Sequence, residues 1–134
     1  MTVILSCIAR CVKVSIDVES LAAEINRTLA LYARQTEEKI DVISEKVASD
    51  GVELLKADSP KSPMGGDYAA SWDYKKVGKK FIIHNKKHYR LTHLLEKGHA
   101  KVNGGRVGAR VHIAPVEDKL INEFKRELQR GLSE

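Results

Sequence analysis

A single helical pattern spans more than a quarter of the chain and constrains the fold more than any other feature. From Val18 onward, apolar or small residues recur at a mean spacing of 3.6 over 36 residues, and no Pro or Gly interrupts them before Gly51. The positions concerned are 18, 21, 25, 29, 32, 36, 40, 43, 47, 51 and 54. This period places them on one face of an α-helix, and Asp17 is suited to cap its first turn.

The pattern predicts a helix from about Val18 to Lys56, which at 1.5 Å per residue would be on the order of 58 Å long. A chain of 134 residues forms a single domain on length alone and cannot cover such a stripe along its whole length. Three arrangements therefore stay open. The helix bends between Gln35 and Glu38, part of it packs against another subunit, or the segment forms two antiparallel helices.

The remaining segments predict an α+β fold in which a small antiparallel sheet of three to four strands packs against the helices. Residues 58–66 contain two Pro and two Gly and are expected to form a loop. Period-two alternation predicts strands at 68–75 and 106–113, the run KFIIHN after a turn at Gly78-Lys79 predicts one at 80–85, and residues 12–17 alternate as a fourth strand would. The first two of these strands are expected to form a hairpin whose inner face receives Trp72.

Two more helices are expected in the C-terminal half. A short one covers 91–97 and ends at Gly98, because a glycine in a left-handed conformation commonly terminates a helix. A closing helix runs from Pro115 to about Arg130, and Gly131 is expected to stop it.

Composition excludes several classes of protein. No apolar run approaches the roughly 20 residues needed to span a bilayer. The apolar N-terminal segment lacks a preceding basic region, so we do not expect a secretion signal. Cys7 and Cys11 are too few for a four-Cys zinc site, and we expect them to be reduced thiols. We expect a single domain that spans 1–134, in which residues 1–11, with both Cys, form a disordered leader.

The net charge of +5 is distributed unevenly along the chain. Between Asp73 and His112, eleven Lys or Arg stand against two carboxylates, which gives this segment a net charge of +9 and leaves −4 for the rest. Such asymmetry predicts a face that attracts an acidic partner, either nucleic acid or an acidic protein surface.

The same segment holds all five His, which raises the question of a metal or nuclease site. His84 falls at a strand end and not on a helix with His88, and Glu96 is the only carboxylate between Asp73 and Glu117, so we expect no metal site. A phage nuclease of the His-Asn-His kind needs a general base beside metal ligands, which the order helix, loop, strand does not provide. The Gly-rich loop lacks the Gly-Lys-Ser/Thr ending of a nucleotide-binding loop. The sequence therefore predicts no catalytic residue, cofactor or metal.

The most specific pattern lies between Tyr89 and Pro115. It reads Tyr-Arg-Leu-Thr-His-Leu-Leu-Glu-x-Gly-His, then Asn-Gly-Gly-Arg-Val, then His-Ile-x-Pro. Over about the last half of the chain this order resembles the gene-product-ten-like tail-completion proteins of long-tailed phages and prophages, which are small virion proteins at the joint between head and tail. The helical first half resembles that family only in its general pattern.

The resemblance implies a non-enzymatic structural protein of the virion that is made in the host cytoplasm and assembles into a ring, of six subunits by analogy with related connector rings. The implied partners are other copies of the chain, neighbouring connector and tail proteins, and DNA passing through the channel, with no membrane and no small-molecule substrate. One alternative stays open on charge alone, a basic accessory protein that binds DNA without sequence specificity.

Within the motif, the residues fall into two expected groups. The residues expected to build the scaffold are Tyr89, Leu94, Glu96, Gly98, Gly104, Gly105 and Pro115. The residues expected to contact a partner or assemble the ring are Arg90, His93, His99, Arg106, Arg110 and His112.

Overall fold

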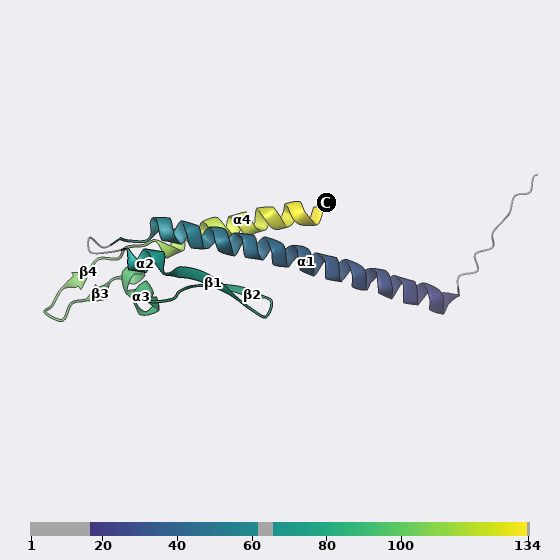
Figure 1. Ribbon diagram of the computed structural model, residues 1–134, viewed down its shortest axis with the longest axis horizontal. Coiled ribbons are helices and arrows are strands. Elements are labelled where there is room, and N and C mark those ends of the chain that lie inside the picture. The colour runs from purple at the N-terminus through teal and green to yellow at the C-terminus, as the bar shows by residue number, and fades with distance from the viewer. Residues whose placement is uncertain (1–16, 62–65, 134) are drawn as a thin grey trace, which may run out of the picture. The chain divides into compact units, whose positions relative to one another are not determined.

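The computed structural model describes residues 17–61 and 66–133 (Figure 1). The chain divides into two compact units, residues 1–34 and 35–134. The boundary between them falls inside the first helix, α1 (Val18–Asp58), and not in the loop at 58–66. The expected strand at 12–17, apart from its last residue, and both Cys lie outside the described residues.

α1 is one helix of 41 residues, so the alternative of two antiparallel helices is wrong. It begins where the sequence predicts, because the carbonyl of Asp17 accepts the first hydrogen bond, from the backbone N–H of Leu21 at 2.9 Å. In the second unit its apolar face is covered. The buried positions of α1 are Val47, Ala48, Gly51, Val52 and Leu55.

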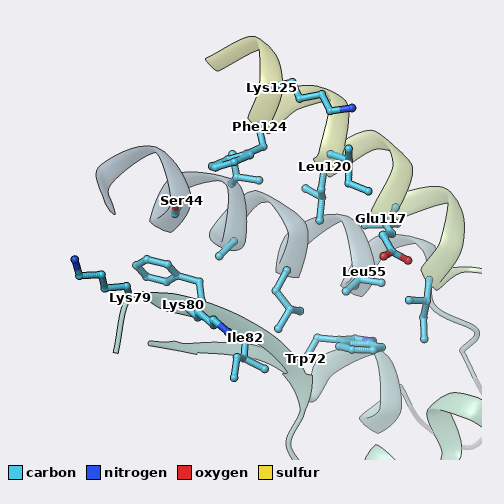
Figure 2. A pocket seen from close by; sticks show the side chains of 17 residues that line it. Ser44, Leu55, Trp72, Lys79, Lys80, Ile82, Glu117, Leu120, Phe124 and Lys125 are labelled. Atoms are coloured by element: carbon cyan, nitrogen blue, oxygen red, sulfur yellow. The ribbon is translucent and has the colours of Figure 1, made fainter. Parts of the chain in front are cut away.

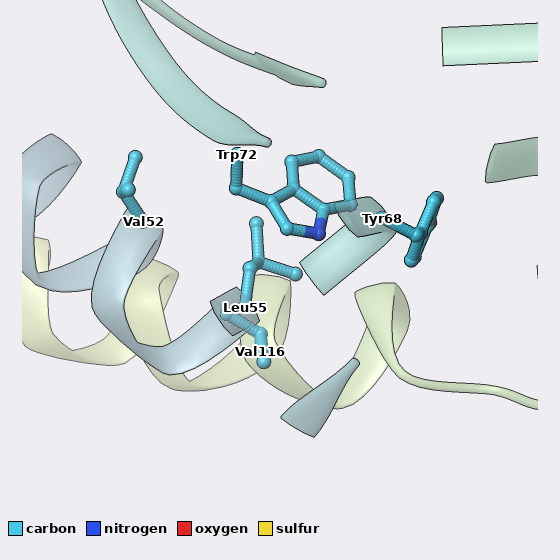
Figure 3. Packing of buried hydrophobic residues seen from close by; sticks show 5 residues of the cluster. All are labelled: Val52, Leu55, Tyr68, Trp72 and Val116. Atoms are coloured by element: carbon cyan, nitrogen blue, oxygen red, sulfur yellow. The ribbon is translucent and has the colours of Figure 1, made fainter. Parts of the chain in front are cut away.

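The core of the second unit forms where α1, the start of the hairpin and the last helix meet. Figure 3 shows Leu55 of α1 facing the ring of Trp72, with Val116 beneath it. Trp72 is 5% exposed, as expected for the inner face of the hairpin, and its Nε1 donates a hydrogen bond to Ser59 Oγ at 2.8 Å. Tyr68 completes the cluster with an edge-on ring contact to Trp72, at 5.8 Å between ring centroids.

The predicted hairpin is confirmed over most of its length. β1 (Trp72–Val77) pairs antiparallel with β2 (Lys80–Asn85), and the residues at their ends, Trp72 and Asn85, are partners. The expected strand from residue 68 is wrong for its first residues, since Tyr68 lies in the short helix α2 (Asp67–Ala70). Asn85 explains the difference: its buried amide donates to the Tyr68 carbonyl at 2.8 Å and accepts from Ser71 Oγ at 2.7 Å, which stabilises a turn there.

The sheet is smaller than predicted. The described residues contain two separate two-stranded sheets, and the second pairs β3 (His99–Ala100) with β4 (Arg106–Val107). The expected strand at 106–113 is therefore wrong beyond Val107. Its later backbone groups bond to the helix α3 (Tyr89–Lys97) and not to another strand, as in the 2.7 Å hydrogen bond from Arg110 N to the carbonyl of Leu95.

The last helix, α4 (Ile113–Ser133), begins two residues before Pro115 and continues past Gly131, so both expected ends are corrected. Pro115 still lies in the first turn, where a missing N–H costs nothing. Gly131 serves packing, because a Cβ there would lie 2.9 Å from Ile43 Cδ1 of α1. Gly51 does the same on α1, where a Cβ would lie 2.6 Å from Leu120 Cδ1. In the part of the chain that the structure describes, no helix is long and apolar enough to cross a membrane.

Candidate functional site

The segment 89–115, hereafter the corner, changes direction sharply at Gly98. α3 ends there with Gly98 at φ 71° and ψ 170°, a backbone region that only glycine adopts readily. A Cβ at this position would lie 2.5 Å from the carbonyl oxygen of Val107 and 3.1 Å from the backbone N of Ala109. Gly98 is thus required twice, for its own conformation and for the backbone that crosses beside it.

The tip of the corner is a tight hairpin loop between β3 and β4. Lys101 N donates to the Gly105 carbonyl at 3.0 Å, and Gly104 N donates to the Lys101 carbonyl at 3.2 Å. Gly104 and Gly105 have φ of 84° and 86°, so both have the positive φ that a tight reversal demands. No other atoms lie within 4 Å of a Cβ built at either glycine.

Glu96 joins the two helices of the corner. Its carboxylate accepts three backbone N–H groups at the start of α4, from His112 at 3.0 Å, Ile113 at 3.1 Å and Ala114 at 3.0 Å. Desolvation raises the pKa of Glu96, but these hydrogen bonds and the nearby His112 outweigh it, so the pKa lies below its usual value. The carboxylate therefore caps α4 from another helix and complements the positive end of its dipole.

His112 lies in the interior of the corner. It is 4% exposed, its Nδ1 hydrogen-bonds the Arg110 carbonyl at 2.8 Å, and its Nε2 lies 2.9 Å from Tyr68 Oη. A carbonyl can only accept, so Nδ1 donates to Arg110, and Glu96 Oε2 lies 3.2 Å from the same nitrogen. Burial, and then the charge of Glu96, raise the pKa of Tyr68 to about 12.

The expected contact residues separate into two groups. Arg90, His93, Arg106 and Arg110 are exposed and can meet a partner, whereas His99 is half-buried and its Nδ1 has no hydrogen-bond partner among the described residues. His112 is corrected from a surface contact to an interior residue, because the alternation that predicted it assumed a strand at 106–113.

Among the expected scaffold residues, Leu94 and Glu96 are half-buried, but Tyr89 is 58% exposed. Tyr89 contacts Arg90, whose Nε donates to Tyr89 Oη at 3.2 Å.

The Tyr68, His112 and Glu96 side chains have the composition of a catalytic relay but not its accessibility. Within the described residues the carboxylate of Glu96 contacts groups of the corner itself, and the His112 ring packs against both Tyr68 and Trp72, with centroid distances of 5.6 Å and 6.4 Å. A general base must reach a substrate proton, which this buried ring does not. Within residues 17–61 and 66–133, no three His, Cys, Asp or Glu side chains are grouped as metal ligands.

The basic segment is partly neutralised by the chain itself. Lys76 Nζ lies 2.7 Å from Asp41 Oδ2 and Lys79 Nζ lies 2.8 Å from Glu37 Oε1, so the hairpin is paired with carboxylates of α1. Lys86 pairs with Asp73 on the neighbouring strand. Exposed ion pairs of this kind add little stability. Their consequence is to reduce the positive charge available to a partner, which is left mainly on the corner and the outer hairpin.

A groove in the second unit, beside the corner, has a cavity volume of about 780 Å³. Figure 2 shows Leu55 of α1, Leu120 and Phe124 of α4 and Trp72 of β1 around it. Its volume falls within the range of roughly 300–1,000 Å³ typical of ligand pockets. Its lining is mostly apolar, and three lysines, Lys79, Lys80 and Lys125, supply most of its charge.

Sequence reasoning missed Tyr68, Asn85 and the groove. Tyr68 and Asn85 hold the corner against the hairpin, yet an isolated Tyr and an Asn at a strand end have no distinctive spacing. The groove lies between predicted elements, among them the strand at 80–85 and the closing helix, but no pattern in either segment says that the two stay apart.

Comparisons with known protein families, with characterised proteins and with solved structures found no match to this chain.

Proposed function

We propose that this chain is a non-enzymatic structural subunit of a phage or prophage virion that assembles into a ring at the joint between head and tail. One observation carries the assembly part of the proposal. Val18, Leu21, Ile25 and Leu29 form an apolar stripe on α1 and are 47–79% exposed. Single exposed apolar side chains are common on protein surfaces and show no regular spacing. A regularly spaced apolar stripe on a long helix therefore indicates a surface that binds a partner.

The corner supports the same proposal from its construction. Its most specific residues, Glu96, Gly98 and His112, are used to fix a helix, a loop and a second helix against one another. Such a corner presents the exposed Arg90, Arg106 and Arg110 on a rigid support. A rigid, satisfied scaffold that carries cations is suited to contact an acidic protein surface or a nucleic-acid backbone.

The experiment uses a phage whose genome carries this chain, with the gene deleted and supplied in trans. The proposal predicts that the deletion leaves separate heads and tails in electron micrographs, and that the intact gene restores joined particles. Arg106→Ala is expected to fold normally and to lower the yield of joined particles. Lys75→Ala, an exposed cation of β1, is the matched control. Normal joining in the deletion strain would rule the proposal out, and normal joining with Arg106→Ala would remove only the contact role of Arg106.

A second candidate function is DNA binding without sequence preference, which the exposed cations of the corner favour. It predicts micromolar or tighter binding of random duplex DNA at physiological salt, with affinity that falls steeply as salt rises. The two functions differ in their response to Ile25→Glu, which changes the stripe and none of the corner cations. This substitution is expected to impair joining of heads to tails and to leave affinity for DNA nearly unchanged.

A further inference from the structure

The stripe on residues 17–34 has carboxylates on its flanks and cations behind it. At about 100° per residue, Val18, Leu21, Ile25 and Leu29 fall within one narrow sector of the helix. On the same wheel Asp17 and Glu24 lie to one side of that sector and Glu19 to the other, each about 90–110° from its centre. Arg27 falls on the opposite face. The surface that this stripe offers to a partner is therefore apolar in the middle and negative at both edges.

This charge arrangement limits the possible occupants. Helices that lie on membranes carry Lys and Arg beside the apolar face, and this stripe carries Asp and Glu instead. In a parallel, in-register pairing of two stripes, the flank that carries Glu19 lies beside the flank of the other copy that carries Asp17 and Glu24, so carboxylates oppose carboxylates across the seam. An antiparallel pairing sets like flanks side by side, so a pairing centred on the stripe brings Glu24 beside Glu24 of the other copy. The complementary partner is an apolar surface with cations at its edges.

The groove of the second unit has those properties. Its lining includes Ile121, which is 45% exposed, Ile82, which is 42% exposed, and the rings of Phe81 and Phe124. Its lining contains one carboxylate, Glu117, and three lysines, which are Lys79, Lys80 and Lys125. Lys79 is paired with Glu37, but neither Lys80 nor Lys125 forms an ion pair within the described part of the chain (Figure 2). Two cations thus stand beside an apolar surface without a carboxylate to neutralise them.

We propose that the stripe of one copy docks into the groove of a second copy, with Glu19 and Glu24 of the first facing Lys80 and Lys125 of the second. The inference rests on the proposed function and specifies how its subunits join. The contact is heterologous, since each copy offers its stripe to one neighbour and its groove to another. Repetition of such a contact closes a ring when the rotation between neighbours permits, whereas pairing of like surfaces would stop at a dimer.

Cysteine crosslinking distinguishes these arrangements. In a Cys7→Ser, Cys11→Ser background, Ile25→Cys marks the stripe and Ile121→Cys marks the groove, and both sites are exposed enough to tolerate the change. Mild oxidation of a mixture of the two single variants is expected to give disulfide-linked heterodimers, and the double variant is expected to give a ladder of higher species. Each single variant alone is expected to remain uncrosslinked. Dimers from Ile25→Cys alone would overturn the proposal in favour of stripe pairing.

Charge reversal tests the flanks. The pair Lys80→Glu, Lys125→Glu is expected to weaken self-association at least tenfold in sedimentation velocity, and so is the pair Glu19→Lys, Glu24→Lys. A mixture of the two doubly substituted proteins is expected to recover association, because each supplies the complement that the other lacks. Arg27→Glu, on the opposite face of the helix, is the control and is expected to change nothing. Absence of recovery in the mixture would overturn the assignment of the flanks to the groove lysines.

The outcome is separable from that of the proposed function. If the crosslink fails in protein that still restores joined particles, the subunits join through another face and the structural function stands. If the crosslink forms but the deletion strain joins heads to tails normally, the contact is correct and the function is wrong.

Discussion

The two parts of α1 carry the same apolar period in different surroundings. In residues 35–58, positions such as Val52 and Leu55 are 6% and 4% exposed, whereas Ile25 and Leu29 in the first unit are 50% and 59% exposed. Helical periodicity reports which face of a helix is apolar, and it is silent about where along the helix a partner covers that face. The difference between the two parts identifies the section of the helix that the second unit does not need for its own core.

Truncation of one leucine in each part of α1 tests most directly whether the two parts differ in their contribution to stability. Leu55→Ala is expected to lower the free energy of unfolding by about 2–5 kcal/mol, because it opens a cavity beside Trp72. Leu29→Ala is expected to change it by less than about 0.5 kcal/mol, since the side chain is already exposed. Urea denaturation at low protein concentration measures both. An equal loss for Leu29→Ala under those conditions would show that the stripe is covered within a single copy.

Much of the fold could be predicted from the sequence, and the errors have a common cause. α1, the paired part of the hairpin and α3 from Leu91 onward were predicted, because each has a period of its own or a glycine at its end. The strand at 106–113 was wrong because its alternation was real but its hydrogen-bond partner was a helix: Glu96 and the Leu95 carbonyl take the place of a neighbouring strand. Such tertiary hydrogen bonds leave no trace in the pattern of apolar residues. For the same reason His112 was assigned to the surface.

Two glycines of the corner, Gly98 and Gly105, allow the cost of a positive φ to be separated from the cost of a steric clash. Gly98→Val is expected to cost on the order of 3 kcal/mol, because it combines a backbone region reserved for glycine with a clash against the Val107 carbonyl. Gly105→Ala is the matched control, since φ is again positive but the space around a Cβ is empty, and a cost of about 1 kcal/mol is expected. Thermal unfolding of both variants measures the gap. Similar losses would mean that backbone conformation alone decides, without the crossing backbone.

Glu96 gives the corner a dependence on acid that the stripe is not expected to share. Glu96→Ala is expected to cost about 2 kcal/mol at neutral pH, because three N–H groups at the start of α4 lose their acceptor. The pKa of Glu96 is lowered in the folded state, so its stabilising contribution is complete above the pKa of an unfolded Glu and is lost as pH falls through the lower, folded value. The gap between wild type and Glu96→Ala should therefore close in acid. Glu117→Ala, an exposed position of α4, is the control and should show no such closing gap.

Tyr68 makes the corresponding prediction in alkali, with a smaller effect. Tyr68→Phe is expected to cost about 1 kcal/mol at neutral pH, since it removes one buried hydrogen bond to His112 and keeps the ring. Burial raises the pKa of Tyr68 from 10.0 to about 12, so between these values the unfolded chain has lost the proton that the folded chain keeps. Stability must then fall as pH rises through this range, and the wild type should lose its advantage over Tyr68→Phe.

The exposed Tyr89 serves as a control for whether the loss of stability in alkali comes from ionisation of the buried Tyr68. Its hydroxyl contacts Arg90 at the surface, so Tyr89→Phe is expected to change the free energy of unfolding by less than about 0.5 kcal/mol. Denaturant midpoints of the wild type and both variants, measured from pH 7 to 12, contain the same background titration of lysines, which cancels in the differences. An advantage of wild type over Tyr68→Phe that persists to pH 12 would mean that Tyr68 ionises in the folded chain as readily as in the unfolded one. The hydrogen bond to His112 would then not be shielded from water, and the corner would be looser than its packing against Trp72 implies.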